Sequence, residues 1–255
     1  MIHHALLSLL LLAHLATTSP AIEGKPRKPL AFFLAGDSTT AIQSTGGGGW
    51  GNGFLELLKS PSYGVNKGHN GATTVSFVEG GDWAEVLDLV KTATNNYDVY
   101  VTIQFGHNDQ VDQKPAKNIT MDQFKMNLEK LAHDVRDLDA TPLLLTSLTR
   151  RNFNGTELIQ DLADVVPATH EAALMADVTL IDLNAASRKY VQAIGSNNAD
   201  KYNLVEGDRT HLNAHGSDVF GCIIADLVIK SDKHLSWGIE KNSTLSYLIA
   251  KGIYV

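Results

Sequence analysis

The chain has 255 residues, 44% of them hydrophobic, so it can bury the core of one ordinary domain. Its formal net charge of -7 argues against a nucleic-acid partner, because no basic stripe is available to neutralise phosphates. Small molecules, glycans and proteins remain as partners.

The N-terminal residues indicate a secreted protein. An apolar stretch over residues 5–16 is too short to span a bilayer but suits a secretory signal, which we expect over residues 1–21. Three N-glycosylation sequons, which begin at Asn118, Asn154 and Asn242, fit passage through a glycosylating compartment. No later segment is long and apolar enough for a membrane helix, so we expect an extracellular protein with no membrane partner.

The first strong element is an apolar run that begins at Leu30 and stops just before Asp37 and Ser38. A short apolar run bounded by turn formers is typical of a strand buried on both faces, and it leaves Ser38 at the carboxyl end of that strand. The glycine-rich segment after it, residues 46–53, lacks both glycine patterns of nucleotide-binding loops. We interpret this segment as a flexible rim that carries one aromatic residue, Trp50, beside Ser38.

Further along the chain, helical and strand patterns alternate. Helices are expected over residues 54–58, 82–94, 121–139, 158–175, 184–194 and 214–230, with a break or kink at Pro167. Strands are expected at the short apolar or β-branched runs over residues 63–66, 97–105, 142–147 and 178–182. Residues 67–74 and 195–211 show no periodicity and are expected to form loops.

The alternation of about five strands with helices predicts an α/β fold, a three-layer α/β/α sandwich with a mostly parallel sheet. One domain over residues 28–235 accounts for the pattern, and residues 236–255 form a C-terminal extension that we expect to pack on it. In open parallel sheets, ligands bind at the carboxyl edge, where Ser38 is expected.

Residues suited to acyl transfer gather on the predicted loops at this edge. Loops after the first three strands carry Ser38, Gly71 and Asn108, and Asp208 and His211 come just before the last strong helix. Acyl transfer needs a nucleophile, a base, an acidic group that orients the base, and donors for the developing oxyanion. The chain offers a candidate for each. Taken alone, however, Ser38 is better interpreted as a helix N-cap, and Gly71 and Asn108 as turn or capping residues.

Four short blocks decide between these interpretations. They are, in chain order, Gly36-Asp37-Ser38, Gly71, Gly106-His107-Asn108-Asp109 and Asp208-Arg209-Thr210-His211. They resemble the blocks of the SGNH or GDSL hydrolase superfamily, whereas the G-x-S-x-G elbow of α/β-hydrolases is absent. The resemblance implies that Ser38 is the nucleophile, His211 the general base and Asp208 the group that orients it. It also implies an oxyanion hole made of the backbone N–H groups of Ser38 and Gly71 and the side-chain amide of Asn108.

Within the superfamily, three details resemble the rhamnogalacturonan acetylesterase group: GDST at residues 36–39, the glycine-rich run with Trp50, and Thr210 in the last block. That group removes acetyl groups from galacturonate residues of pectin, in secreted form and without a cofactor. We therefore expect a monomeric esterase, with no cofactor, that acts on an acetylated polysaccharide of the plant cell wall. Related members act on acetylated xylan, and loop chemistry makes the choice.

An acidic protein that meets a galacturonate polymer needs local cations. Lys67, Arg150, Arg151 and Arg209 are candidates by position. Arg209 comes first because it lies inside the last block, and a surface salt bridge is its alternative role.

Other residues also have two interpretations. His107 and Trp50 are candidate substrate contacts, with a structural role as the alternative for His107. His215 follows the predicted base by four residues, as a second zinc ligand on a helix would, but neither H-E-x-x-H nor a cysteine ligand accompanies it. We therefore expect no metal site. Asp37 and Asp109 resemble acids that bond the loop backbone in this superfamily, so we interpret them as scaffold.

Two rival functions stay open. A secreted lipase or arylesterase would show a continuous apolar rim around Ser38, which the glycine- and asparagine-rich loops do not favour. A glycan-binding glycoprotein on a decayed hydrolase scaffold is the non-enzymatic alternative. The intact set of Ser38, Asn108, Asp208 and His211 argues against it.

Overall fold

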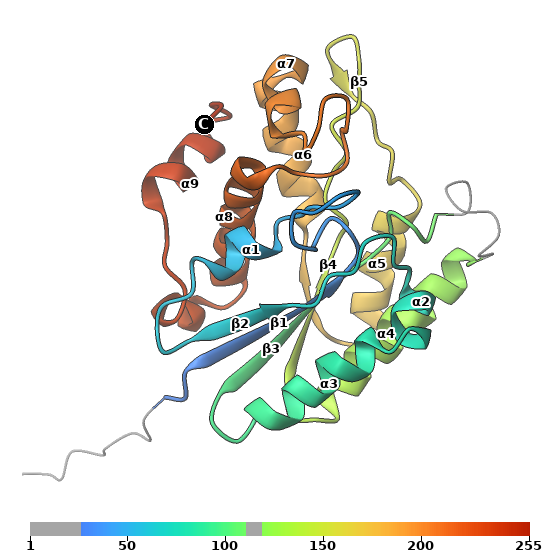
Figure 1. The fold of residues 1–255 in the computed structure, drawn as a ribbon, viewed down its shortest axis with the longest axis vertical. Coiled ribbons are helices and arrows are strands. Elements are labelled where there is room, and N and C mark those ends of the chain that lie inside the picture. Colours follow the sequence, from blue (N-terminus) through green and yellow to red (C-terminus); the bar gives the residue numbers. More distant parts are fainter. Residues whose placement is uncertain (1–26, 111–118) are drawn as a thin grey trace, which may run out of the picture.

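A five-stranded parallel sheet lies at the centre of the computed structural model, which describes residues 27–110 and 119–255 (Figure 1). The strand order is β2-β1-β3-β4-β7. The strands are β1 (Leu30–Gly36), β2 (Tyr63–Asn66), β3 (Asp98–Gln104), β4 (Thr141–Leu145) and β7 (Thr179–Ile181). Gly36 at the end of β1 pairs with Gln104 at the end of β3. The carboxyl ends of the central strands therefore meet at one edge of the sheet.

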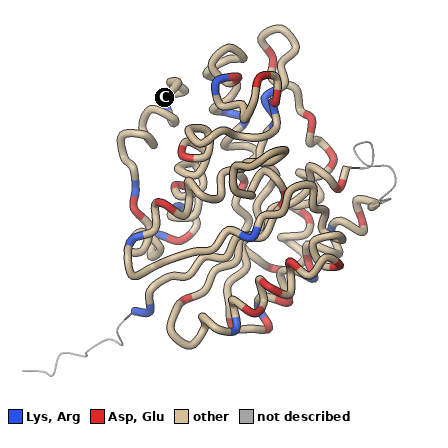
Figure 2. The backbone as a smooth tube through the Cα atoms, in the orientation of Figure 1, with Lys and Arg blue, Asp and Glu red and all other residues tan. Residues whose placement is uncertain are grey.

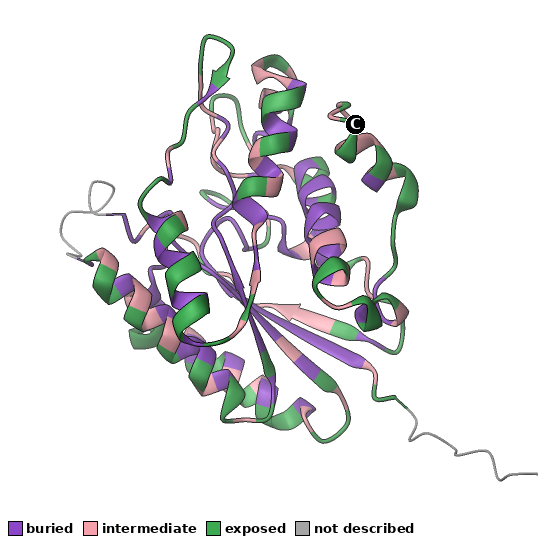
Figure 3. Cartoon of the chain, turned by 180° about the vertical axis from the view of Figure 1, so that it is seen from behind, coloured by how far each residue is buried: buried purple, intermediate pink, exposed green. Residues whose placement is uncertain are grey.

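Helices cover both faces of the sheet, as the alternation of side chains along β1 requires. Phe33 and Ala35 face one core, which is shared with α3 (Asp82–Ala93), α4 (Met121–Arg136) and α5 (Val165–Met175). Phe32 and Leu34 face the opposite core, which is shared with α1 (Gly51–Leu55), α6 (Leu183–Ile194) and α8 (Ala214–Ser231). The buried stripes of the helices face the strands and the exposed stripes face away (Figure 3). The predicted three-layer α/β/α sandwich is confirmed.

The segment predicted as a loop over residues 195–211 contains two short helices, α7 (Ser196–Ala199) and η2 (Asp200–Tyr202), and a third, α2 (Thr74–Glu79), begins at the last residue of the other predicted loop. They are too short for an apolar period to show in the sequence. The helix predicted over residues 158–175 is shorter in the structure, where α5 begins at Val165. Pro167 lies in the first turn of α5, where a missing N–H costs no helical bond. The residues before it form a hairpin of β5 (Phe153–Asn154) and β6 (Glu157–Leu158).

The residues after α8 form η3 (Lys233–Trp237) and α9 (Ser243–Ala250), and α9 packs against α8 (Figure 1). No helix within the described residues is long and apolar enough to cross a bilayer. The predicted signal segment, residues 1–21, and the sequon at Asn118 lie outside the described residues.

Candidate active site

The turn after β1 fixes Ser38 at the carboxyl edge of the sheet. The Asp37 carboxylate accepts hydrogen bonds from the Thr39 backbone N–H at 2.9 Å and from the Thr39 hydroxyl at 2.8 Å. Burial raises the pKa of Asp37, and the bonds from Thr39 oppose that rise. Because Asp37 is fully buried, it holds the turn and does not meet substrate. Its interpretation as scaffold is confirmed.

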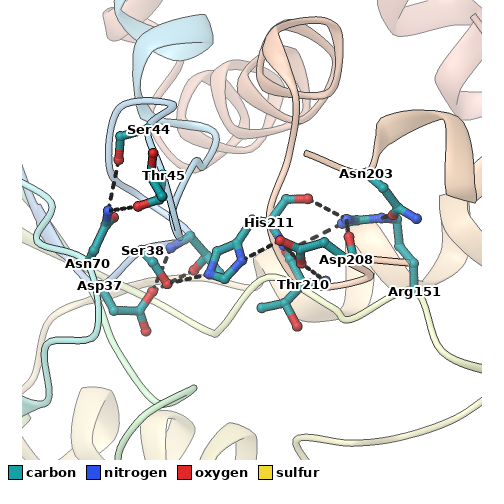
Figure 4. Close-up of polar contacts among 11 residues, drawn as sticks. Asp37, Ser38, Ser44, Thr45, Asn70, Arg151, Asn203, Asp208, Thr210 and His211 are labelled. Carbon is teal, nitrogen blue, oxygen red and sulfur yellow. Dashed lines mark hydrogen bonds and ion pairs between the residues drawn. The ribbon is translucent and has the colours of Figure 1, made fainter. Parts of the chain in front are cut away.

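Ser38, His211 and Asp208 form a continuous chain of hydrogen bonds (Figure 4). His211 Nε2 lies 2.8 Å from Ser38 Oγ, and His211 Nδ1 lies 2.9 Å from Asp208 Oδ2. An ionised carboxylate only accepts hydrogen bonds, so Nδ1 carries the hydrogen and Nε2 presents its lone pair to the serine hydroxyl. The imidazole can therefore take the Ser38 proton while Asp208 stabilises the imidazolium that forms.

Backbone donors fix the orientation of Asp208. Its Oδ1 accepts hydrogen bonds from the N–H groups of Thr210 at 3.1 Å and His211 at 2.9 Å. Burial tends to raise the pKa of Asp208, but the hydrogen bonds from His211 and Thr210 outweigh burial, so the pKa lies below its ordinary value. Asp208 is therefore ionised at neutral pH, as the tautomer of His211 requires.

A buried arginine holds the loop that carries Asp208 and His211. The Arg151 guanidinium donates to the carbonyls of Asp208 at 3.1 Å and His211 at 2.6 Å, and to the Asn203 side chain at 3.0 Å (Figure 4). Burial lowers the pKa of Arg151 to about 10, so the group stays charged at neutral pH. Arg151 has no exposed surface, so its prediction as a cation for substrate is wrong. Its role is to position the loop.

Gly48 joins the segment of Ser38 to the segment of His211. Its N–H donates to the Ser38 carbonyl at 3.0 Å, and its own carbonyl accepts from the Leu212 N–H at 2.8 Å. A Cβ atom at this position would lie 2.7 Å from the Leu212 carbonyl oxygen, so the close approach requires glycine. Residues 47–50 are buried. The predicted flexible rim is therefore wrong, and this segment is a packed bridge.

The indole of Trp50 lies in the core rather than on a rim. It is 0% exposed, and its Nε1–H donates to Gln104 Oε1 at 2.7 Å. The side-chain amide of Gln104 in turn donates from Nε2 to the Thr39 hydroxyl oxygen at 3.0 Å. The predicted substrate contact of Trp50 is wrong, because a fully buried ring leaves no surface for a sugar. Instead, Trp50 ties the loop after β1 to the end of β3.

The loops after β2 and β3 bind each other. Asn108 Nδ2 donates to the Ala72 carbonyl at 3.0 Å, and the Asp109 carboxylate accepts from the Thr74 N–H at 2.8 Å. Gly71 adopts a φ of 76°, the left-handed conformation that glycine favours. A side-chain amide carries two N–H groups, so Asn108 has a second donor besides the one that fixes it. The interpretation of Asp109 as loop scaffold is confirmed.

The sequence profile of the GDSL-like Lipase/Acylhydrolase family matches residues 34–219. The chain belongs to this family. It is 30% identical over 210 residues to the probable rhamnogalacturonan acetylesterase YesY of Bacillus subtilis, and the aligned region covers 80% of this chain and 93% of that protein. It is also 30% identical over 216 residues to the rhamnogalacturonan acetylesterase RhgT of the same organism, which covers 78% of this chain and 90% of that protein. The family resemblance seen in the motif blocks is confirmed, and the chain is a carboxylic ester hydrolase.

A solved structure of the same fold supports the architecture. A catalytic mutant of Axe2, an acetylxylan esterase from Geobacillus stearothermophilus, superposes with a TM-score of 0.57 at 17% identity, over 82% of this chain and 96% of that one.

In this GDSL-family esterase, two further predicted contacts already have protein partners. His107 is 4% exposed, and its Nε2 donates to the Leu148 carbonyl at 3.0 Å. Burial, and then the charge of Arg150, lowers the pKa of His107 to about 3, so its imidazole is neutral. Arg209 forms two hydrogen bonds with the Asp200 carboxylate, at 2.9 and 3.0 Å. A contact of His107 or Arg209 with substrate stays a prediction.

The remaining candidates lie apart from the hydrogen-bonded chain of Ser38. His215 Nε2 donates to the Val255 carbonyl at 2.8 Å, and Lys67 pairs with Glu85. Within residues 27–110 and 119–255, no three His, Cys, Asp or Glu side chains are grouped to hold a metal ion. Asn154 and Asn242, the two described sequon residues, are exposed.

Proposed function

We propose that this GDSL-family esterase removes O-acetyl groups from acetylated rhamnogalacturonan, a pectic polysaccharide, through an acyl-enzyme on Ser38. The observation that carries the proposal is the hydrogen-bonded chain from Ser38 to His211 (2.8 Å) and on to Asp208 (2.9 Å). The substrate class comes from the names of the relatives YesY and RhgT. The fold alone does not choose the ester, because one fold hosts many substrates.

In the first half of the reaction, Ser38 Oγ attacks the acetyl carbonyl carbon while His211 Nε2 takes the hydroxyl proton. The backbone N–H groups of Ser38 and Gly71 and the second Asn108 N–H stabilise the negative oxygen of the tetrahedral intermediate. The imidazolium then gives its proton to the sugar oxygen as the ester bond breaks, which leaves an acetyl group on Ser38 and a free sugar hydroxyl.

In the second half, His211 takes a proton from a water molecule that attacks the acetyl group. Collapse of the second tetrahedral intermediate releases acetate and returns the proton to Ser38. Asp208 stays ionised throughout and stabilises the imidazolium in both halves. No step needs a cofactor.

The catalytic part of the proposal is tested with Ser38→Ala and a chromogenic acetyl ester. We expect this variant to lose hydrolysis while its melting temperature stays near that of the parent, because one buried hydroxyl is removed without a change in packing. Full activity in the folded variant would remove the mechanism.

The substrate is tested with the purified parent enzyme and three esters: acetylated rhamnogalacturonan, acetylated xylan and a triglyceride. Released acid is measured at equal ester concentrations. We expect the highest kcat/KM on rhamnogalacturonan. Faster release from xylan would transfer the assignment to an acetylxylan esterase, and faster release from the triglyceride would transfer it to a lipase.

We further propose that the enzyme is secreted and glycosylated. The apolar stretch at residues 5–16 and the exposed positions of Asn154 and Asn242 support this proposal. Expression in a eukaryotic host should give protein in the medium that starts near residue 22 and shifts in mass on glycosidase treatment. Retention of the intact N-terminus inside the cells would contradict it.

A further inference from the structure

We propose that Arg150 binds the carboxylate of a galacturonate residue in the substrate, an inference that rests on the pectic substrate proposed above. Arg150 lies in the loop after β4 and is half-buried. Its guanidinium Nη2 donates one long hydrogen bond, at 3.4 Å, to the His107 carbonyl.

The other three cations that the sequence places near this edge are already engaged. Lys67 and Arg209 each form a salt bridge with a carboxylate of the protein. The Arg151 guanidinium is buried and donates to loop carbonyls and to an asparagine side chain. Within the described part of the chain, Arg150 forms no salt bridge, so its charge is available to an anionic ligand.

The position of Arg150 suits an anion next to the scissile ester. The His107 carbonyl belongs to the peptide bond that joins His107 to Asn108, so the guanidinium lies against the backbone of the residue whose side-chain amide is the proposed oxyanion donor. His107 is nearly fully buried, so water is limited on the side of the guanidinium that faces it. The charge of Arg150 contributes to the lowered pKa of His107, which agrees with this proximity.

The chemistry of the ligand follows from the charge of the two partners. A galacturonate ring carries both the acetylated hydroxyl and a carboxylate, and the planar fork of a guanidinium matches the two oxygens of that carboxylate. The protein has a net charge of -7, and acidic residues lie along α3 and α4 (Figure 2). A polyanion therefore needs a local cation at the point where it is to be cleaved.

The test measures inhibition of chromogenic acetyl ester hydrolysis by deacetylated rhamnogalacturonan oligosaccharides. A second set of the same oligosaccharides has its carboxylates reduced to primary alcohols. We expect Arg150→Gln to raise the inhibition constant of the acidic set about 10- to 100-fold, because charged hydrogen bonds are lost. The inhibition constant of the reduced set and the kcat for the small ester should stay within about twofold. Arg150→Lys should recover part of the loss.

Arg188→Gln is the matched control. Arg188 is also half-buried and donates to a backbone carbonyl, that of Ile159, at 2.9 Å, so the variant removes one equal charge elsewhere. It should leave both inhibition constants unchanged. The proposal would be overturned if the acidic set had the same inhibition constant for the parent and for Arg150→Gln. It would also be overturned if Arg150→Gln raised the inhibition constants of the acidic and the reduced sets by the same factor. A wrong substrate assignment would show separately, as slow hydrolysis of acetylated rhamnogalacturonan by the parent enzyme in the substrate assay.

Discussion

Replacing Asp208 by asparagine tests the orientation of the base, because the amide must choose between two poor arrangements. In one, the NH₂ group faces His211 Nδ1 and the amide oxygen keeps the two backbone bonds from Thr210 (3.1 Å) and His211 (2.9 Å). Nδ1 must then accept, so Nε2 carries the hydrogen and points it at Ser38. The imidazole keeps its place but no longer has a lone pair for the serine proton.

In the other arrangement the amide oxygen faces Nδ1, and the NH₂ group opposes two backbone N–H donors. Losing those two bonds costs about 1–3 kcal/mol each, so this orientation is scarcely populated. We therefore expect Asp208→Asn to lower kcat about 10³- to 10⁴-fold, the size known for the same change in a serine protease triad, or about 4–5.5 kcal/mol in the barrier.

The assay is steady-state hydrolysis of a chromogenic acetyl ester at neutral pH, with melting temperature measured in parallel. Asp200→Asn is the matched control. It makes the same replacement of a carboxylate by an amide, but Asp200 lies outside the hydrogen-bonded chain of Ser38 and pairs with Arg209. It should keep activity within a few fold. A folded Asp208→Asn enzyme within tenfold of the parent would refute the reasoning.

Three further variants test other contacts. Asn108→Ala should lower kcat about 10²- to 10³-fold with little change in KM, because it removes the proposed oxyanion donor, and an unchanged kcat would exclude that role. Trp50→Phe breaks the bond to Gln104, so it should lower stability by about 1–3 kcal/mol in urea unfolding and leave KM for an acetylated oligosaccharide unchanged; a higher KM would restore the substrate contact. Because the folded pKa of His107 lies near 3, below the unfolded value of 6.5, the unfolded state binds more protons between these values. The free energy of unfolding of the parent, relative to that of His107→Gln, which keeps a donor for Leu148, should therefore fall by about 1.4 kcal/mol for each pH unit below 6.5. An equal difference in urea midpoint between the two proteins at pH 6.5 and at pH 5 would contradict this.

The sheet and the position of Ser38 could be predicted because their signals are local, whereas the roles of Ser38, Asp208 and His211 were implied by the resemblance of four separated blocks to a known superfamily. The apolar run before Asp37 ends where β1 ends, and the residues that follow each strand end come together for topological reasons. Ser38 follows β1, whereas His211 lies in the loop before α8 and is held beside Ser38 by the contacts of Gly48 and Arg151. The predicted positions of both therefore agree with the geometry.

The roles of Trp50 and Arg151 could not be predicted, because they depend on partners distant in sequence. An aromatic residue in a glycine-rich segment shows no period, and only the structure reveals that Gln104 receives its N–H. Arginine is rarely fully buried. After β4, no alternation of apolar and polar residues marks Arg151 rather than Arg150 as the buried one of the two. The short helix α2 also gave no signal, since six residues hold less than two turns.

The bridge through Gly48 has a practical consequence for ligand design. Main-chain bonds fasten the nucleophile segment to the base segment, so the relative position of Ser38 and His211 rests on the protein's own backbone. A boronate or phosphonate inhibitor would meet the geometry that the acetyl group meets, with no reorganisation to offset its affinity. The bridge therefore makes the distance between Ser38 and His211 a fixed constraint in the design of such compounds.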